Sequence, residues 1–166
     1  DFWDDEKELI TNAQFFFIAS SWKGYIDCNI KSGDPGFVKV FEGGVIEYPE
    51  YDGNSMYRTA GNIIKNPNVA LLFVNFDGKS RRIRINGQAS IHRDKRSLEK
   101  HYGSKFVVRI ECEIYPNCPR YFPNLQDNMP SPHIPREGKG VPPSPEWKKR
   151  DYIRNILPDG DPHKKS

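Results

Sequence analysis

The pattern of apolar positions divides the first two-thirds of the chain into short strands and a few helices. The predicted strands of this part are residues 15–20, 24–31, 37–41, 45–48 and 69–76. Turn residues such as Gly33, Asp34 and Pro35 separate them. The last strand is apolar on both faces, which predicts a central position with both faces buried. The predicted helices are residues 4–14, 55–65 and 95–102.

Two longer segments, residues 82–91 and 105–114, alternate strictly between apolar and polar side chains. In the first, Ile83 and Ile85 face one way while Arg82 and Arg84 face the other. Such alternation is typical of a strand with one face on a core and one on solvent or a polar site. Because the helices are few and do not alternate with the strands, the order excludes a doubly wound parallel sheet. It favours a small antiparallel barrel with helices at its ends.

The composition sets the last part of the chain apart. The protein has 166 residues, and 11 of its 14 prolines lie from Pro116 onward. We therefore expect one compact domain over residues 1–122. A proline-rich arm, residues 123–166, follows it and packs on the barrel or on a dimer partner.

Charge and cysteine content exclude several classes of protein. The net charge of +3 comes without the dense Lys/Arg stripe of a nucleic-acid surface. No apolar run approaches the roughly 20 residues of a membrane helix, and no basic-then-apolar secretion signal opens the chain. The 3 cysteines are an odd number at wide spacing, which argues against a disulfide framework and for the cytoplasm. Neither cysteines nor histidines show metal-site spacing, so no metal is expected.

The strongest candidate for chemistry is the segment at residues 48–58, where a strand ends and a helix is predicted to begin. Helix N-termini present free N–H groups and a partial positive charge, which suits a phosphate. Asn54 and Ser55 add side-chain donors, and Arg58 lies one turn into the helix. The alternative is an ordinary capped helix with a solvated arginine.

Other candidates are weaker. Arg82 and Arg84 project from the same strand face and are spaced to hold a phosphate or to place a donor against a ring, unless that face is simply solvated. Lys31 alone reads as a surface lysine. Arg120 and Tyr121 can form a pocket wall beside an inert Cys118. The sequence has no P-loop and no nucleophile elbow, so any chemistry requires a borrowed cofactor.

Taken in order, several short segments resemble one known family. They are residues 16–20, 34–38, 51–56, 61–63, 66–73, 84–89 and 117–121. Together they make the chain similar to the pyridoxamine 5′-phosphate oxidase-related, FMN-binding split-barrel family from about residue 8 to residue 121. The stretches at 134–138 and 152–161 resemble one branch of that family with a proline-rich arm.

This resemblance implies a mainly β fold, a six-stranded antiparallel Greek-key split barrel, and a homodimer with FMN at the subunit interface. The implied cofactor-binding residues are Lys31, Pro49, Gly53, Asn54, Ser55, Met56, Arg58, Arg82 and Arg84. The substrate-pocket candidates are Tyr51, Arg120 and Tyr121. No catalytic residue is identified.

The chain departs from true pyridoxamine 5′-phosphate oxidases at its C-terminal end. The sequences of those enzymes end in an arginine-rich element that binds the substrate phosphate, whereas this chain continues into the proline-rich arm. We therefore expect an FMN-dependent oxidoreductase that acts on another small molecule. The alternatives are a non-catalytic flavin-binding or flavin-sensing module and a reductase that uses a deazaflavin.

Overall fold

The structure is a computed structural model that describes residues 1–75, 81–115, 134–141, 143–144, 146–155 and 157–164. Its strands are β1 Phe15–Trp22, β2 Tyr25–Ser32, β3 Lys39–Phe41, β4 Val45–Glu50, β5 Asn68–Val74, β6 Arg82–His92 and β7 Phe106–Tyr115. Its helices are α1 Asp4–Asn12, α2 Arg58–Lys65, α3 Lys95–Glu99, the 3-10 helix η1 Glu146–Lys149 and α4 Asp151–Arg154.

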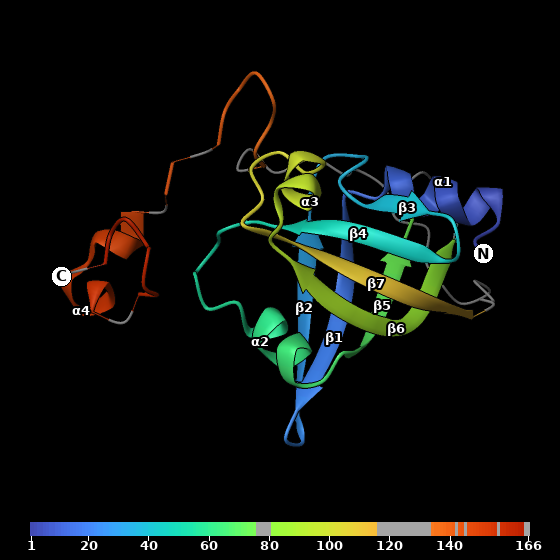
Figure 1. Cartoon of the computed structure of the whole chain (residues 1–166), viewed down its shortest axis with the longest axis horizontal. Helices are drawn as coiled ribbons and strands as arrows, with labels where there is room; N and C mark the ends of the chain where they lie inside the picture. Colours follow the sequence, from blue (N-terminus) through green and yellow to red (C-terminus); the bar gives the residue numbers. More distant parts are fainter. Residues whose placement is uncertain (76–80, 116–133, 142, 145, 156, 165–166) are drawn as a thin grey trace.

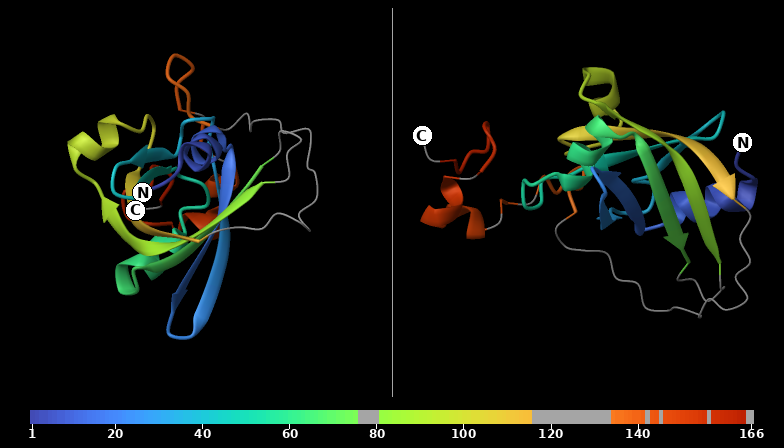
Figure 2. Two further views of the ribbon diagram at one scale, coloured as in Figure 1. Left: turned by 90° about the vertical axis from the view of Figure 1, so that its right-hand side faces the viewer. Right: turned by 90° about the horizontal axis from the view of Figure 1, so that it is seen from below.

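The strands form one antiparallel sheet in the order β2-β1-β5-β6-β7-β4-β3 (Figure 1). The sheet curls around the core, as the two turned views show (Figure 2). The expected mainly β, antiparallel split barrel is confirmed. It has seven strands rather than six, because part of the 37–41 segment adds the three-residue strand β3 at one edge.

Aromatic and branched side chains fill the barrel. Phe16 is fully buried and lies with its ring centroid 4.9 Å from that of Phe73 and 5.0 Å from that of Tyr48. Helix α1 adds Leu9 and Ile10 to the same core. The N-terminal helix therefore contributes to the core instead of lying on its surface.

The alternation predicted for β6 is confirmed, since Ile83 and Ile85 are buried while Arg84 is exposed. The prediction that β5 is buried on both faces is wrong. Its residues Asn68 and Ala70 are exposed, although β5 lies between β1 and β6. This outer face of the sheet has no helix of the described chain packed over Ala70.

All three predicted helices are shorter in the structure, and α1 ends at Asn12 rather than at residue 14. Helix α2 begins at Arg58, three residues after the Ser55 that was expected to open it, and α3 ends at Glu99. Asp94 caps α3 by accepting the Ser97 backbone N–H at 3.0 Å. Within the described part of the chain, no helix is long and apolar enough to cross a membrane.

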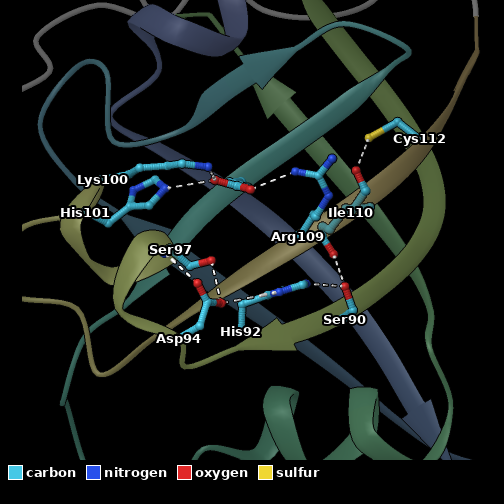
Figure 3. A network of polar contacts seen from close by, with 10 residues as sticks. Ser90, His92, Asp94, Ser97, Lys100, His101, Arg109, Ile110 and Cys112 are labelled. Atoms are coloured by element: carbon cyan, nitrogen blue, oxygen red, sulfur yellow. Dashed lines mark hydrogen bonds and ion pairs between the residues drawn. The ribbon is translucent and has the colours of Figure 1, made fainter.

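A buried carboxylate fastens α3 and β7 to β4. Glu47 on β4 accepts hydrogen bonds from Arg109 Nη1 at 2.8 Å and Lys100 Nζ at 3.4 Å, and His101 Nε2 lies 3.7 Å away. Figure 3 labels Lys100, His101 and Arg109, which point toward one another around the contacts that they make with Glu47. Burial acts to raise the pKa of Glu47, but the cations outweigh it and the pKa is lowered. The group therefore stays ionised as the centre of the cluster.

Ile85→Ala should destabilise the barrel by roughly 2–5 kcal/mol, because it removes methylene groups from a fully buried position. The neighbouring Arg84→Ala should change the free energy of unfolding by less than about 1 kcal/mol, because its side chain points to the outer face. Urea denaturation without added flavin measures both. Equal losses in the two variants would contradict the observed alternation.

His101→Gln should alter the response of the barrel to acid. Burial and repulsion from Lys39 lower the pKa of His101 from 6.5 to about 4, with a smaller contribution from Lys100 and opposition from Glu47. The unfolded chain therefore binds the proton more readily, and the wild type loses stability as pH falls from about 6.5 to about 4.

The neutral glutamine has no such proton uptake. The wild type should therefore lose about 3 kcal/mol more than the variant over this range. Urea titrations at several pH values between these limits measure the difference. A gap that does not change with pH would show that His101 does not titrate in this way.

Candidate functional site

A cavity of about 440 Å³ lies where β2 and β4 end, beside the connection from β4 to α2. Most of the predicted cofactor-binding residues line it, and so does Tyr51. These residues are Lys31, Pro49, Gly53, Asn54, Ser55, Met56 and Arg58. Segments that are far apart in the sequence thus meet at one site, as the sequence analysis expected.

The connection at residues 51–57, here called the 51–57 loop, is irregular rather than helical. Ser55 has φ 59° and Tyr57 has φ 46°, both in the left-handed region that costs free energy for residues other than glycine. Helix α2 starts only at Arg58, so Ser55 does not cap it. Arg58, the first residue of α2, nevertheless lines the cavity, so the helix begins at the cavity wall.

Lys31 and Glu50 form a buried ion pair in the cavity wall. Lys31 Nζ donates to Glu50 Oε1 at 2.6 Å, and both side chains are about nine-tenths buried. Glu50 Oε2 is also buried and has no hydrogen-bond partner among the residues that the structure describes. Burial raises the pKa of Glu50, and Lys31 offsets this only in part. This carboxyl group therefore holds its proton to higher pH than a surface glutamate does.

The second cation of the cavity is also paired, but more loosely. Arg58 Nη2 lies 3.7 Å from Asp27 Oδ1, and the arginine side chain remains 62% exposed. Asn29 Nδ2 donates to Thr59 Oγ1 at 3.3 Å, which ties β2 to the start of α2. The cavity therefore combines one tightly held cation with one that is able to change partners.

Ser55 is not free to act as a simple phosphate donor. It is buried, and its Oγ lies 2.9 Å from Asp52 Oδ1 and 3.0 Å from Asp161 Oδ2. Lys148 Nζ donates to the same hydroxyl at 2.5 Å. The C-terminal arm thus reaches the loop that was predicted to bind the cofactor.

Arg82 and Arg84 do not line this cavity, so the structure separates them from the rest of the predicted site. They lie on β6, whose exposed Asn86 and Gln88 border a groove of about 900 Å³ over the open face of the sheet. The strand parity of β6 was predicted correctly. Within one chain Arg82 and Arg84 lie outside the cavity of Lys31 and Arg58, and a shared site at a subunit interface stays a prediction.

Several site residues were missed from the sequence. Glu50 and Asp27 line the cavity, and the acidic residue at the end of β4 was a usable signal for Glu50. Lys148 gave no signal, because it is 93 residues from Ser55 along the chain. Arg120, Tyr121 and Cys118 lie outside the described residues. Cys28 and Cys112 are free thiols, and burial raises the pKa of Cys112 to about 12.

Three solved structures are similar to this chain, and the first of them supports the fold. A HupZ protein of Group A Streptococcus matches with a TM-score of 0.53 at 21% identity, over 69% of this chain and 98% of that one. A FAD-binding protein of Mesorhizobium loti matches with a TM-score of 0.46 at 13% identity, over 68% and 91%. An F420 reductase matches with a TM-score of 0.46 at 15% identity, over 64% and 92%.

Comparison of sequences identifies the family. No curated protein matches the chain. The sequence profile described as pyridoxamine 5′-phosphate oxidase matches residues 2–125, which is the barrel and the start of the segment that follows it. The chain therefore belongs to the pyridoxamine 5′-phosphate oxidase family, which includes flavin-dependent oxidoreductases.

Proposed function

We propose that this protein is an FMN-binding flavoprotein and an FMN-dependent oxidoreductase that acts on a small molecule. The observation that carries the proposal is the convergence of Lys31, Arg58 and the start of α2 on one cavity. Two cations and a helix N-terminus suit a phosphate group, and the family supplies the flavin.

The residues of the cavity fit a phosphorylated ligand. Its volume of about 440 Å³ lies within the range of small-molecule sites, roughly 300–1,000 Å³. Arg58 is exposed and only loosely paired, so its guanidinium group can exchange Asp27 for a phosphate. Lys31 stays bound to Glu50 and places a positive charge at the same wall without leaving its partner.

The bound flavin would supply hydride or electron transfer through its ring. The chain would hold the phosphate and offer polar groups to the ring or the substrate. Glu50 has a buried oxygen without a described partner, which suits an N–H donor or a transferable proton. Tyr51 also lines the cavity, and burial raises its pKa with a further contribution from Asp34, so its hydroxyl remains a donor.

We also propose that the protein acts as a homodimer with the flavin at the subunit interface. Two large apolar side chains on the same face of β2 are exposed, with Ile26 at 80% and Ile30 at 51%. Ile26 borders the groove of about 900 Å³ on the open sheet face. Exposed apolar clusters of this kind are typical of interaction surfaces. A second copy covering this face would bring its own Arg82 and Arg84 toward the cavity of the first.

The purified protein should bind FMN far more tightly than riboflavin. Charge-assisted hydrogen bonds contribute roughly 1.5–3 kcal/mol each, so the loss of two phosphate contacts should weaken binding by about 100-fold or more. Fluorescence titration of ligand-free protein with FMN, riboflavin and a phosphorylated deazaflavin measures this ratio. Equal affinity for FMN and riboflavin would contradict the phosphate site. Preferential binding of the deazaflavin would identify a deazaflavin, rather than FMN, as the cofactor.

Turnover is tested on the loaded protein. Reduction of the bound flavin by NADH or NADPH, followed by oxidation with a panel of small acceptors, is expected for an oxidoreductase. Flavin that binds but is not reduced and reoxidised would make the protein a binding or sensing module instead.

Arg84→Ala should weaken FMN binding by about tenfold or more, as expected for the loss of one charge-assisted contact across the dimer interface. The matched control is Lys95→Ala, whose side chain is 90% exposed on α3. Light scattering measures the mass of both variants with FMN present. Wild-type affinity in Arg84→Ala would show that the β6 face is merely solvated.

A further inference from the structure

The most deeply buried charge in the described chain belongs to the C-terminal arm. Lys148, in η1, is fully buried. Its Nζ donates to Asp52 Oδ2 at 2.7 Å, to Ser55 Oγ at 2.5 Å and to Asp161 Oδ2 at 2.9 Å. An ammonium group has three N–H donors, and here three oxygen atoms accept from it. A surface lysine needs no such site, so the arrangement requires an explanation.

The same contacts keep Lys148 and Asp161 in their charged forms. Burial acts to lower the pKa of Lys148, but the bonds to Asp52 and Asp161 outweigh it and raise the pKa. Asp161 has a lowered pKa, because its bonds to the His163 N–H, Lys148 and Ser55 outweigh the effect of burial. One cation thus stands between two carboxylates, and without it two negative charges would lie beside the cavity.

The cluster joins the arm to the least regular part of the barrel. Asp52 and Ser55 belong to the 51–57 loop, and both line the cavity. Ser55 holds a left-handed backbone conformation that its neighbours must stabilise. Lys148 lies 96 residues from Asp52 and 93 from Ser55. The loop is therefore bonded to residues from the far end of the chain.

The arm segment that carries Lys148 and Asp161 is itself braced. Asp161 Oδ1 accepts the His163 backbone N–H at 2.9 Å, and Arg154 Nε donates to the carbonyl of His163 at 3.1 Å. Lys164 Nζ donates to the carbonyl of Leu157 at 2.7 Å, and Leu157 is buried. These bonds connect the described residues around Asp161 to one another.

The arm also meets the barrel on another side of the cavity. Ile134 lines the cavity itself. Arg136 forms two bonds to Asp34, from Nε at 2.5 Å and from Nη2 at 2.7 Å, in the connection between β2 and β3. The arm is therefore attached both to the 51–57 loop and to the turn after β2.

We infer that Lys148 is a positioning residue for the flavin site. It holds the 51–57 loop in the conformation that presents the cavity to the flavin phosphate. It also neutralises carboxylates that would otherwise repel that phosphate. The inference rests on the proposed function for the identity of the ligand, but its effect on the loop does not.

The test compares Lys148→Met with Lys149→Met. Lys149 is the adjacent residue of η1, is exposed, and bonds only to Glu146 among the contacts described. Hydrogen–deuterium exchange without flavin should show faster exchange of the 51–57 loop in Lys148→Met, with β5 and β6 unchanged. Lys149→Met should match the wild type throughout.

Flavin binding gives a second readout that general loss of packing would not produce. Lys148→Met should weaken FMN binding by about tenfold or more while leaving riboflavin binding unchanged, because the loss concerns the phosphate. Asp161→Asn serves as a milder variant of the same cluster if Lys148→Met does not fold. It should also speed exchange in the loop.

The outcomes separate the two hypotheses. If neither wild type nor variants bind FMN, the proposed function is wrong, and the exchange data still decide whether Lys148 positions the loop. Wild-type exchange in the loop of both Lys148→Met and Asp161→Asn would overturn the inference. An equal loss of FMN and riboflavin affinity would also overturn it, since it would indicate a general structural role.

Discussion

The Lys31–Glu50 ion pair joins β2 and β4, two strands that lie at or near opposite edges of the sheet. β2 is one edge of the sheet, and β4 lies next to the other edge, so no backbone ladder connects them. Their side chains meet at 2.6 Å in a buried position, where ionised groups are tolerated only when paired. This contact brings the two ends of the curled sheet together and forms one wall of the cavity. The site therefore exists because the barrel closes there.

The strands of the barrel could be predicted from the sequence because their signals are local. Alternation along β6 placed Ile83 and Ile85 in the core without knowledge of any partner strand. The start of α2 could not be predicted in this way. Asn54 and Ser55 have the local preferences of helix caps, but Ser55 bonds instead to Lys148 and Asp161, and the helix begins three residues later. A local preference was overridden by residues about 100 positions away.

The sequence predicted which residues line the candidate site better than it predicted how their charges are paired. The sequence identifies the cations Lys31 and Arg58, but not the carboxylates of Glu50 and Asp27 that pair with them. As in the Glu47 cluster on the other side of β4, the cations of the cavity are already paired with carboxylates of the chain. A phosphate entering it must compete with existing partners, which makes selectivity depend on the looser pair at Arg58. The alternation of β6 predicts that the Arg84 side chain points to the outer face of the sheet, where it is exposed. The sequence of one chain does not predict which surface covers that face.

The long separation between Ser55 and Asp161 has a consequence for the order of assembly. The two residues are 106 positions apart, and all seven strands lie before the arm in the sequence. During synthesis the N-terminal part of a chain emerges first, and local contacts form faster than distant ones. The barrel strands are therefore made before the arm residues that bond to the 51–57 loop. A nascent chain passes through a stage in which the sheet is complete and the cavity beside it has not yet acquired its final wall.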